Sequence, residues 1–92
     1  MIKSFGCAKT EAVFNQESVK GFPAEILKPA YRKLLRLETA PNVNELRIPP
    51  ANHLEKLKGD LDGFWSIRVN DQYRIIFRWD NGAHDVRIVD YH

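Results

Sequence analysis

Three arginines near the C-terminal end of the sequence occupy alternating positions, as residues on one face of a sheet do. In segment 64–69, alternation places Arg68 on one face of the strand and the large apolar residues on the other. In segment 73–79 it places Arg74 and Arg78 on the face away from the apolar residues in the same way. Facing residues of adjacent antiparallel strands have Cβ atoms roughly 5 Å apart, and a guanidinium fork matches a phosphate bidentately. The pattern therefore predicts an anion site suited to a phosphodiester. The alternative is that each arginine is solvated or pairs with a carboxylate such as Asp60, Asp62 or Asp71.

The last three residues form the densest run of titratable groups in the chain: Asp90, Tyr91 and His92. Histidine titrates near neutral pH and acts as a general acid or base, and a carboxylate can accept a proton or orient an imidazole. If the run continues an anchored strand, these groups are held in place. The alternative is a solvated strand end without a chemical role.

Other polar residues give weaker signals. His53 and Lys58 flank a short candidate strand and are expected to line the arginine surface, although a lone surface histidine is the alternative for His53. Cys7 and the scattered histidines do not have metal-ligand spacing, so no metal and no cofactor is expected.

The composition bounds the class of protein. A chain of 92 residues is expected to form one domain over 1–92, and its 43% hydrophobic and 28% charged residues are ordinary for a globular protein. No apolar run reaches the roughly 18 residues of a membrane span, so we expect a cytoplasmic protein. The formal charge of +2 does not by itself indicate a nucleic-acid partner.

The period of the apolar residues changes from helical to alternating near residue 51, which predicts helices followed by a sheet. Pro29 predicts a kink or a restart inside the second helix. The final strand changes parity, which predicts a bulge or burial on both faces. The fold class is therefore α+β, an antiparallel sheet of about four to five strands with N-terminal helices packed on one face. The expected helices are 8–16 and 23–39, and the expected strands are 53–58, 64–69, 73–79 and 83–91, with a short starting strand at 3–5.

Several segments together resemble the HigB family of toxins in the RelE superfamily of toxin-antitoxin systems. They are the Met-Ile-Lys-Ser-Phe start, the Leu-Glu-Lys-Leu-Lys-Gly segment at 54–59, the stretch Gly-Phe-Trp-Ser-Ile-Arg-Val-Asn-Asp-Gln-Tyr-Arg-Ile-Ile-Phe at 63–77 and the ending Val-Asp-Tyr-His. The resemblance covers nearly the whole chain and implies the RelE-like form of the α+β fold. It also implies a ribosome-dependent endoribonuclease that cuts mRNA in the A site of the small subunit without metal. The implied partner is a HigA-like antitoxin with a helix-turn-helix domain, so DNA is contacted only through the antitoxin.

Metal-free RNA cleavage assigns roles to the candidates. A base must take the 2′-hydroxyl proton, cations must balance the charge on the phosphate, and an acid must protonate the leaving 5′ oxygen. Under the resemblance, Arg68, Arg74 and Lys58 are the cations, Asp90 and His92 are the base and acid, and Tyr91 stacks on a base or positions the RNA. Two further residues complete the expected substrate-binding set. They are His53 and Asp71, of which Asp71 lies in the turn between segments 64–69 and 73–79.

One position departs from some relatives, which carry histidine where this chain has Glu55. Under strict alternation His53 shares a strand face with Glu55 and could partly replace that imidazole. Two other functions stay open at this stage. One is a non-catalytic module of the same fold that binds RNA or ribosomes, and the other is a purely protein-binding partner in a regulatory complex.

Overall fold

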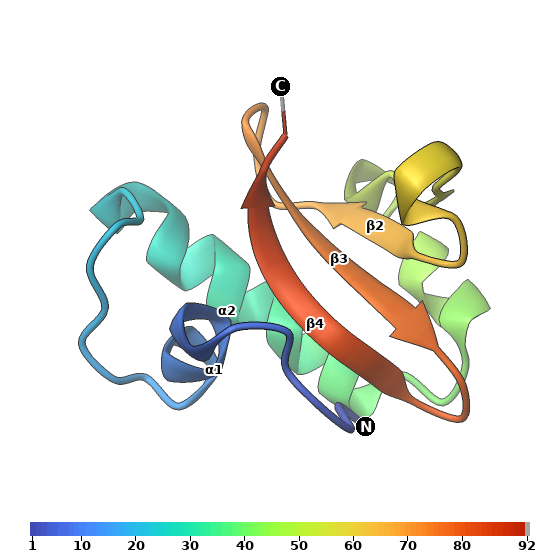
Figure 1. The fold of residues 1–92 in the computed structure, drawn as a ribbon, viewed down its shortest axis with the longest axis horizontal. Coiled ribbons are helices and arrows are strands. Elements are labelled where there is room, and N and C mark those ends of the chain that lie inside the picture. Colours follow the sequence, from blue (N-terminus) through green and yellow to red (C-terminus); the bar gives the residue numbers. More distant parts are fainter. Residues whose placement is uncertain (92) are drawn as a thin grey trace.

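The computed structural model describes residues 1–91 and has two helices followed by a four-stranded antiparallel sheet (Figure 1). The strands lie in the sheet in chain order, β1-β2-β3-β4. The predicted α+β class is therefore confirmed. Within the described residues, no helix is long and apolar enough to cross a membrane. The elements are α1 (Ala8–Phe14), α2 (Ala24–Thr39), β1 (Glu55–Lys56), β2 (Trp65–Arg68), β3 (Tyr73–Trp79) and β4 (Ala83–Asp90), with 3-10 turns at Val43–Arg47, Pro50–Asn52 and Gly59–Leu61.

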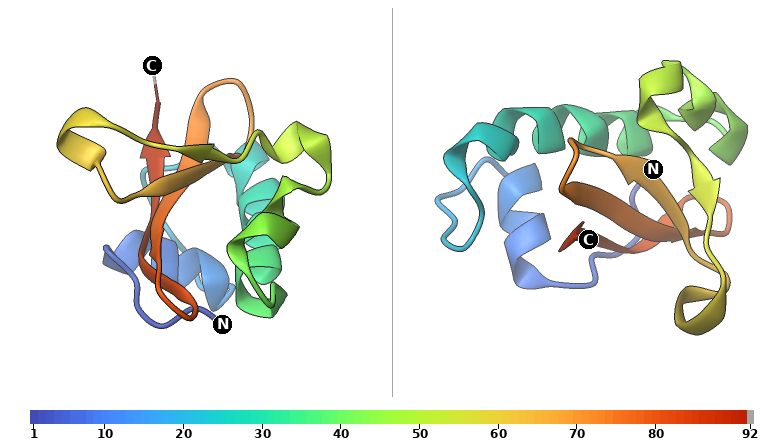
Figure 2. Two further views of the ribbon diagram at one scale, coloured as in Figure 1. Left: turned by 90° about the vertical axis from the view of Figure 1, so that its right-hand side faces the viewer. Right: turned by 90° about the horizontal axis from the view of Figure 1, so that it is seen from above.

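Helix α2 covers one face of the sheet. Its buried residues recur at spacings of three and four, which places them on one side of the helix. They pack against the alternate residues of β2, β3 and β4 that point toward the helix. Figure 2 shows α2 along one side of the sheet, while the turn Gly59–Leu61, drawn in yellow, projects on the other side. The central buried set is Ile26, Ala30, Leu34, Leu37, Ile67, Ile75, Phe77, Val86 and Ile88.

Proline at position 29 does not interrupt α2. The helix is continuous over its 16 residues with Pro29 inside it, so of the predicted kink or restart there is no restart. The amide that proline lacks would have bonded within the first turns of the helix. Burial of Ala30 and Leu34 just beyond the proline keeps this part of the chain helical, because packing outweighs local propensity.

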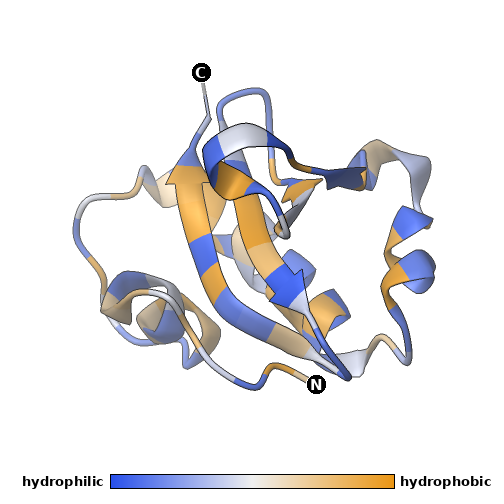
Figure 3. Ribbon diagram, turned by 45° about the vertical axis from the view of Figure 1, so that its right-hand side comes forward, coloured by the Kyte–Doolittle hydropathy of each residue, from blue (hydrophilic) through white to orange (hydrophobic). Residues whose placement is uncertain are grey.

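The β3–β4 hairpin contains the predicted bulge. Ile76 pairs with Arg87 but Arg78 pairs with His84, so two residues of β4 oppose Phe77 alone. The extra residue lets both Ala83 and Val86 point toward the core, which explains the change of parity in the sequence. Hydrophobic stretches alternate with hydrophilic ones along β3 and β4 (Figure 3).

The N-terminal segment lies beside β4, parallel to it. The amide of Lys3 donates to the carbonyl of Ala83 at 2.7 Å, and isolated bridges join Ile2 and Phe5 to β4, so the predicted starting strand is reduced to two bridges. Gly82 is required at this junction because a Cβ there would lie 2.7 Å from the Met1 carbonyl oxygen. The segment thus protects one edge of the sheet and leaves the face away from α2 open.

Helix α1 packs against α2 and against the β4 edge. Thr10, which is fully buried, accepts a hydrogen bond of 2.9 Å from the amide of Ile88. This bond satisfies an edge amide that no strand covers, so the C-terminal half of β4 is fixed where it leads into the last residues.

Candidate functional site

Arg68 and Arg74 face each other on adjacent strands. They are register partners in the β2–β3 pair, on the sheet face away from α2, as predicted. The turn between them is closed by the Asn70 side chain, whose oxygen accepts from the amides of Gln72 at 2.9 Å and Tyr73 at 2.7 Å. The asparagine turn therefore sets the register that brings the two guanidinium groups to the same place.

The Arg74 side chain is held by several neighbours and is only 13% exposed. One terminal nitrogen, Nη1, donates to the Ser66 hydroxyl at 2.7 Å and reaches the His53 carbonyl at 3.5 Å. The other, Nη2, donates to Glu55 Oε1 at 3.3 Å. The guanidinium carbon lies 5.2 Å from the centre of the Tyr91 ring. These contacts orient the guanidinium before any ligand arrives, which lowers the entropy cost of binding a phosphate.

Arg68 is less constrained. It is 35% exposed, and its Nη2 bonds to the carboxylate of Asp71, which is 97% exposed. Ion pairs this open to solvent contribute about 0 to 1 kcal/mol. The structure therefore shows for Arg68 the pairing with a carboxylate that the sequence left open as an alternative. The carboxylate is that of Asp71, which neutralises the arginine. An incoming phosphate can displace such a weak pair.

The C-terminal run is anchored to the β2–β3 turn. The amide of Tyr91 donates to the Gln72 carbonyl at 2.7 Å, and the Gln72 side chain donates to Asp90 Oδ2 at 3.0 Å. Asp90 pairs with Tyr73, whose side chain belongs to the core, so alternation places Asp90 on the helix side of the sheet. Tyr91 lies on the arginine side, against Arg74. His92 lies outside the described residues.

The predicted strand 53–58 is only two residues long, and this changes the position of His53. His53 has a left-handed backbone with φ of 46° and ends a 3-10 turn. The expectation that it shares a strand face with Glu55 is therefore wrong. Its carbonyl, at 3.5 Å, is the group that meets Arg74. Lys58 is exposed just before the turn Gly59–Leu61.

A buried asparagine fixes the chain before His53. The Asn52 amide donates to the carbonyls of Leu46 at 3.1 Å and Ile48 at 3.3 Å, and its oxygen accepts from Lys33 Nζ. Burial and the nearby Arg36 charge lower the pKa of Lys33 from its usual value. The network joins α2 to the segment that carries His53 and Glu55.

Three residues of this site were not among the predicted site residues: Ser66, Glu55 and Asn52. Ser66 carries a recognisable signal, because it lies two residues before Arg68 and therefore on the same open face of β2. Glu55 was noted only as a departure from relatives, and nothing in the sequence marks Asn52 as buried. Within residues 1–91, no cluster of histidine, cysteine and carboxylate side chains is suited to hold a metal ion.

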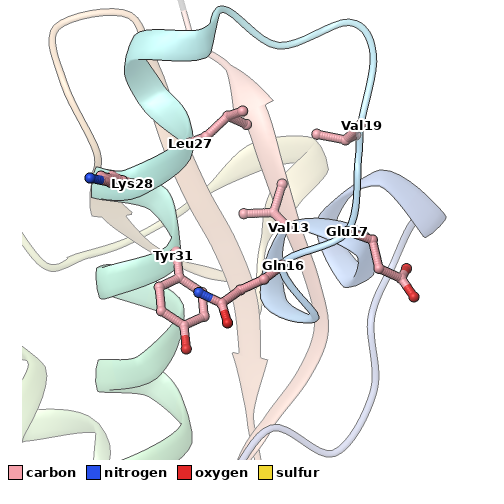
Figure 4. A pocket seen from close by; sticks show the side chains of 7 residues that line it. All are labelled: Val13, Gln16, Glu17, Val19, Leu27, Lys28 and Tyr31. Carbon is pink, nitrogen blue, oxygen red and sulfur yellow. The ribbon is translucent and has the colours of Figure 1, made fainter.

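A separate hollow of about 210 Å³ lies on the helix side, between α1, the following loop and α2 (Figure 4). Its lining is mostly apolar, with Val13, Val19, Leu27 and Tyr31 among its residues. It contains none of the arginines of the open face and therefore does not belong to the site described above.

The fold is shared with bacterial toxins of the RelE-like class. One similar solved structure is the YoeB-YefM complex from Staphylococcus aureus, with a TM-score of 0.61, 22% identity and coverage of 100% of this chain and 95% of that one. Another is the YoeB/ParE toxin from Agrobacterium tumefaciens, with a TM-score of 0.52, 18% identity and coverage of 99% and 98%.

Sequence relatives define the family more narrowly. The model of the HigB-like toxin family, "RelE-like toxin of type II toxin-antitoxin system HigB", matches residues 3–92, and the chain belongs to this family. It is 36% identical to Endoribonuclease HigB of Proteus vulgaris over 100% of both chains. It is 49% identical to Toxin HigB-1 of Vibrio cholerae over 61 residues, which span 66% of this chain and 64% of that protein.

Proposed function

We propose that this toxin is an endoribonuclease that cleaves mRNA in the A site of the ribosome and so stops translation. The observation that carries the proposal is the restrained Arg74 fork facing Arg68 on an open sheet face. Membership of the HigB-like family and similarity to an endoribonuclease over the full length support the same conclusion. The toxin acts where ribosomes translate, in the cytoplasm.

The proposed chemistry is transfer of the phosphodiester to the neighbouring 2′-hydroxyl. A base removes the 2′ proton, the 2′ oxygen attacks phosphorus, and the bond to the 5′ oxygen breaks as an acid protonates the leaving group. Arg68 and Arg74 stabilise the charge on the phosphate oxygens, a role that needs no metal. Arg74 offers a fork already oriented by Ser66 and Glu55, so little reorganisation accompanies the reaction.

Proton transfer is assigned to the C-terminal carboxylate and histidine. Asp90 is tied to Gln72, so its position is defined relative to the β2–β3 turn that carries Arg68 and Arg74 at its two ends. We assign one transfer to His92 and the other to Asp90, whose side chain lies on the helix side at the last position of β4 and therefore acts on the phosphate around the end of that strand. Glu55 holds Arg74, and Tyr91 lies over the same guanidinium with a ring able to stack on a base.

The proposed inhibitor is a HigA-like antitoxin with a helix-turn-helix domain, which links the toxin to DNA indirectly. Family membership in a type II toxin-antitoxin system supports an antitoxin partner. The similar YoeB structure is a complex with YefM. His53 and Asp71, which contact Arg74 and Arg68, are proposed substrate contacts, and Lys58 is a proposed contact farther along the RNA, beside the start of β2.

The deciding experiment compares mRNA on programmed ribosomes with the same mRNA free in solution. The wild-type toxin should cut only the ribosome-bound message, and Arg74→Ala should cut neither. Binding to ribosomes without cleavage by the wild type would favour a non-catalytic RNA-binding module. Equal cleavage of free and bound mRNA would remove the ribosome from the proposal.

A further inference from the structure

A second pair of arginines lies on the same open face, around one aromatic ring. The guanidinium carbons of Arg78 and Arg87 lie 5.6 Å and 5.7 Å from the centre of the Phe64 ring. The register explains the arrangement. Trp65 pairs with Phe77, so Phe64 comes beside Arg78, and Arg87 pairs with Ile76 in the next row. Strands β3 and β4 and the residue just before β2 thus contribute to this cluster, which we call the Phe64 cluster (Phe64, Arg78 and Arg87).

The charges of the Phe64 cluster are not neutralised by ion pairs. Over residues 1–91 the ion pairs are Arg68 with Asp71 and Arg74 with Glu55, so Arg78 and Arg87 have no carboxylate partner there. Arg87 Nε is buried and has no hydrogen-bond acceptor. Two like charges on one ring repel each other, and a phosphate bound by their terminal nitrogens relieves that repulsion, so the cluster is favourable for an anion.

The apolar packing beneath the cluster does not require guanidinium groups. Ile76 is 2% exposed and Leu57 is 7% exposed, yet neither belongs to the main core, so they form a small apolar patch under the open face. The alkyl stems of arginine can cover such a patch, but methionine or lysine would do so equally well. The two guanidinium forks therefore need another explanation.

The Phe64 cluster lies to one side of the phosphate site at Arg74. Arg74 and Arg78 lie four residues apart on β3, which corresponds to about 13 Å along a strand. Between them lies the row of Ser66, Ile76 and Arg87. A hollow of about 270 Å³ adjoins Arg78 on the far side, and it also contains the carboxylates of Asp80 and Asp85. An anion is therefore best placed between Arg78 and Arg87, toward the Arg74 site.

We propose that the Phe64 cluster is a second phosphate subsite, which binds an RNA backbone phosphate away from the scissile bond. The inference rests on the proposed function for the nature of the ligand, an RNA phosphodiester. Phe64 holds both guanidinium groups by cation-π contact, and each fork can then donate two hydrogen bonds to the phosphate. The RNA is either the flanking part of the mRNA or ribosomal RNA of the A site, and both present the same group.

The test compares Arg78→Gln and the double variant Arg78→Gln/Arg87→Gln with wild type. Arg78 is exposed, so its substitution leaves the core intact, and circular dichroism checks the double variant. Arg32→Gln is the matched control because Arg32 is exposed on α2, which covers the other face. Affinity is measured against salt for a fluorescent single-stranded RNA oligonucleotide and for ribosomes without mRNA. Each lost phosphate contact should lower the salt slope by roughly 0.7.

The subsite predicts that Arg78→Gln weakens binding about fivefold or more, that the double variant weakens it further, and that Arg32→Gln changes it little. Loss of oligonucleotide binding assigns the phosphate to mRNA, and loss of ribosome binding alone assigns it to ribosomal RNA. In cleavage on programmed ribosomes, KM should rise while kcat changes little. Arg78→Lys should recover only part of the affinity, because it restores the charge without the fork.

Affinity and salt slope equal to those of wild type in both variants would overturn the subsite, as would an equal loss in Arg32→Gln. The binding assay does not depend on cleavage. A toxin that binds RNA through these arginines but does not cut would therefore contradict the proposed function and leave the subsite standing. Normal cleavage by the double variant with unchanged KM would contradict the subsite and leave the proposed function standing.

Discussion

The guanidinium of Arg74 donates a 2.7 Å hydrogen bond to the hydroxyl of Ser66, a side chain with no exposed surface. The hydrogen bond satisfies the buried hydroxyl and also orients the guanidinium. A buried hydroxyl requires a partner, and a phosphate-binding fork requires a fixed direction. We predict that Ser66→Ala lowers kcat/KM for cleavage on programmed ribosomes by roughly 10- to 100-fold, since hydrogen bonds to charged groups contribute about 1.5 to 3 kcal/mol.

The Ser66 prediction has a simple control. Ser18→Ala removes a hydroxyl from an exposed loop and should leave cleavage unchanged. Ser66→Ala should remain folded, because Arg74 keeps its bonds to Glu55 and to the His53 carbonyl, and circular dichroism checks this. Wild-type cleavage by Ser66→Ala would show that the fork is oriented without this bond.

The two facing arginines should respond differently to lysine. Arg74 uses both terminal nitrogens on fixed acceptors, whereas Arg68 is held by one highly exposed carboxylate. A lysine keeps the charge and loses the fork. We expect Arg74→Lys to lose about 100-fold in kcat/KM and Arg68→Lys about tenfold or less, with both alanine variants unable to arrest growth. Equal losses in the two lysine variants would contradict this ranking.

The sheet was predictable because its signals are local. Alternation in 64–69 and 73–79 and the parity change in the last strand predict β2, β3 and β4 with their bulge. Two details of the fold depend on non-local contacts. The restart at Pro29 is absent because α2 is buried along its length, and strand 53–58 is short because Asn52 holds the preceding turn.

The site was predictable in part. Strand parity and register place Arg68 and Arg74 opposite each other, and this needs only the position of the turn at Asn70. Contacts between distant segments were not predictable in this way. Ser66 and the His53 carbonyl meet Arg74 only after three segments are assembled, and alternation gives no sign that the guanidinium leans toward β1.

Tyr91 should act through its ring. The ring lies 5.2 Å from the Arg74 guanidinium carbon and is 43% exposed, so one face is available to a base. Tyr91→Phe should keep cleavage within about threefold of wild type. Tyr91→Ala should lower it by tenfold or more, because base stacking contributes about 1 to 3 kcal/mol. The reverse order, with Phe as poor as Ala, would indicate that the hydroxyl takes part in the reaction.

Asn52 should matter for stability as well as for activity. Its substitution by alanine removes the partner of the buried Leu46 carbonyl and of two partly buried groups, the Ile48 carbonyl and the Lys33 ammonium. We expect a loss of about 2 to 3 kcal/mol in the free energy of unfolding, or roughly 10 to 20 °C in Tm. Asn44→Ala, in the exposed 3-10 turn, is the control and should cost about 0.5 kcal/mol or less. A loss that small in Asn52→Ala would show that the network is dispensable.

The carboxylates of Glu55 and Asp90 should have different roles, one as a hydrogen-bond acceptor and the other in proton transfer. Glu55 accepts from Arg74, and an amide oxygen can still accept that bond, so Glu55→Gln should reduce cleavage by only about three- to tenfold. Asp90 accepts from Gln72, and asparagine preserves that bond while losing the ability to take a proton. If Asp90 transfers the proton, Asp90→Asn should lower kcat by 100-fold or more with KM nearly unchanged, as general acid-base groups contribute about 10² to 10⁴. Single-turnover cleavage on programmed ribosomes measures both variants, and a larger loss of kcat in Glu55→Gln would assign the proton transfer to Glu55.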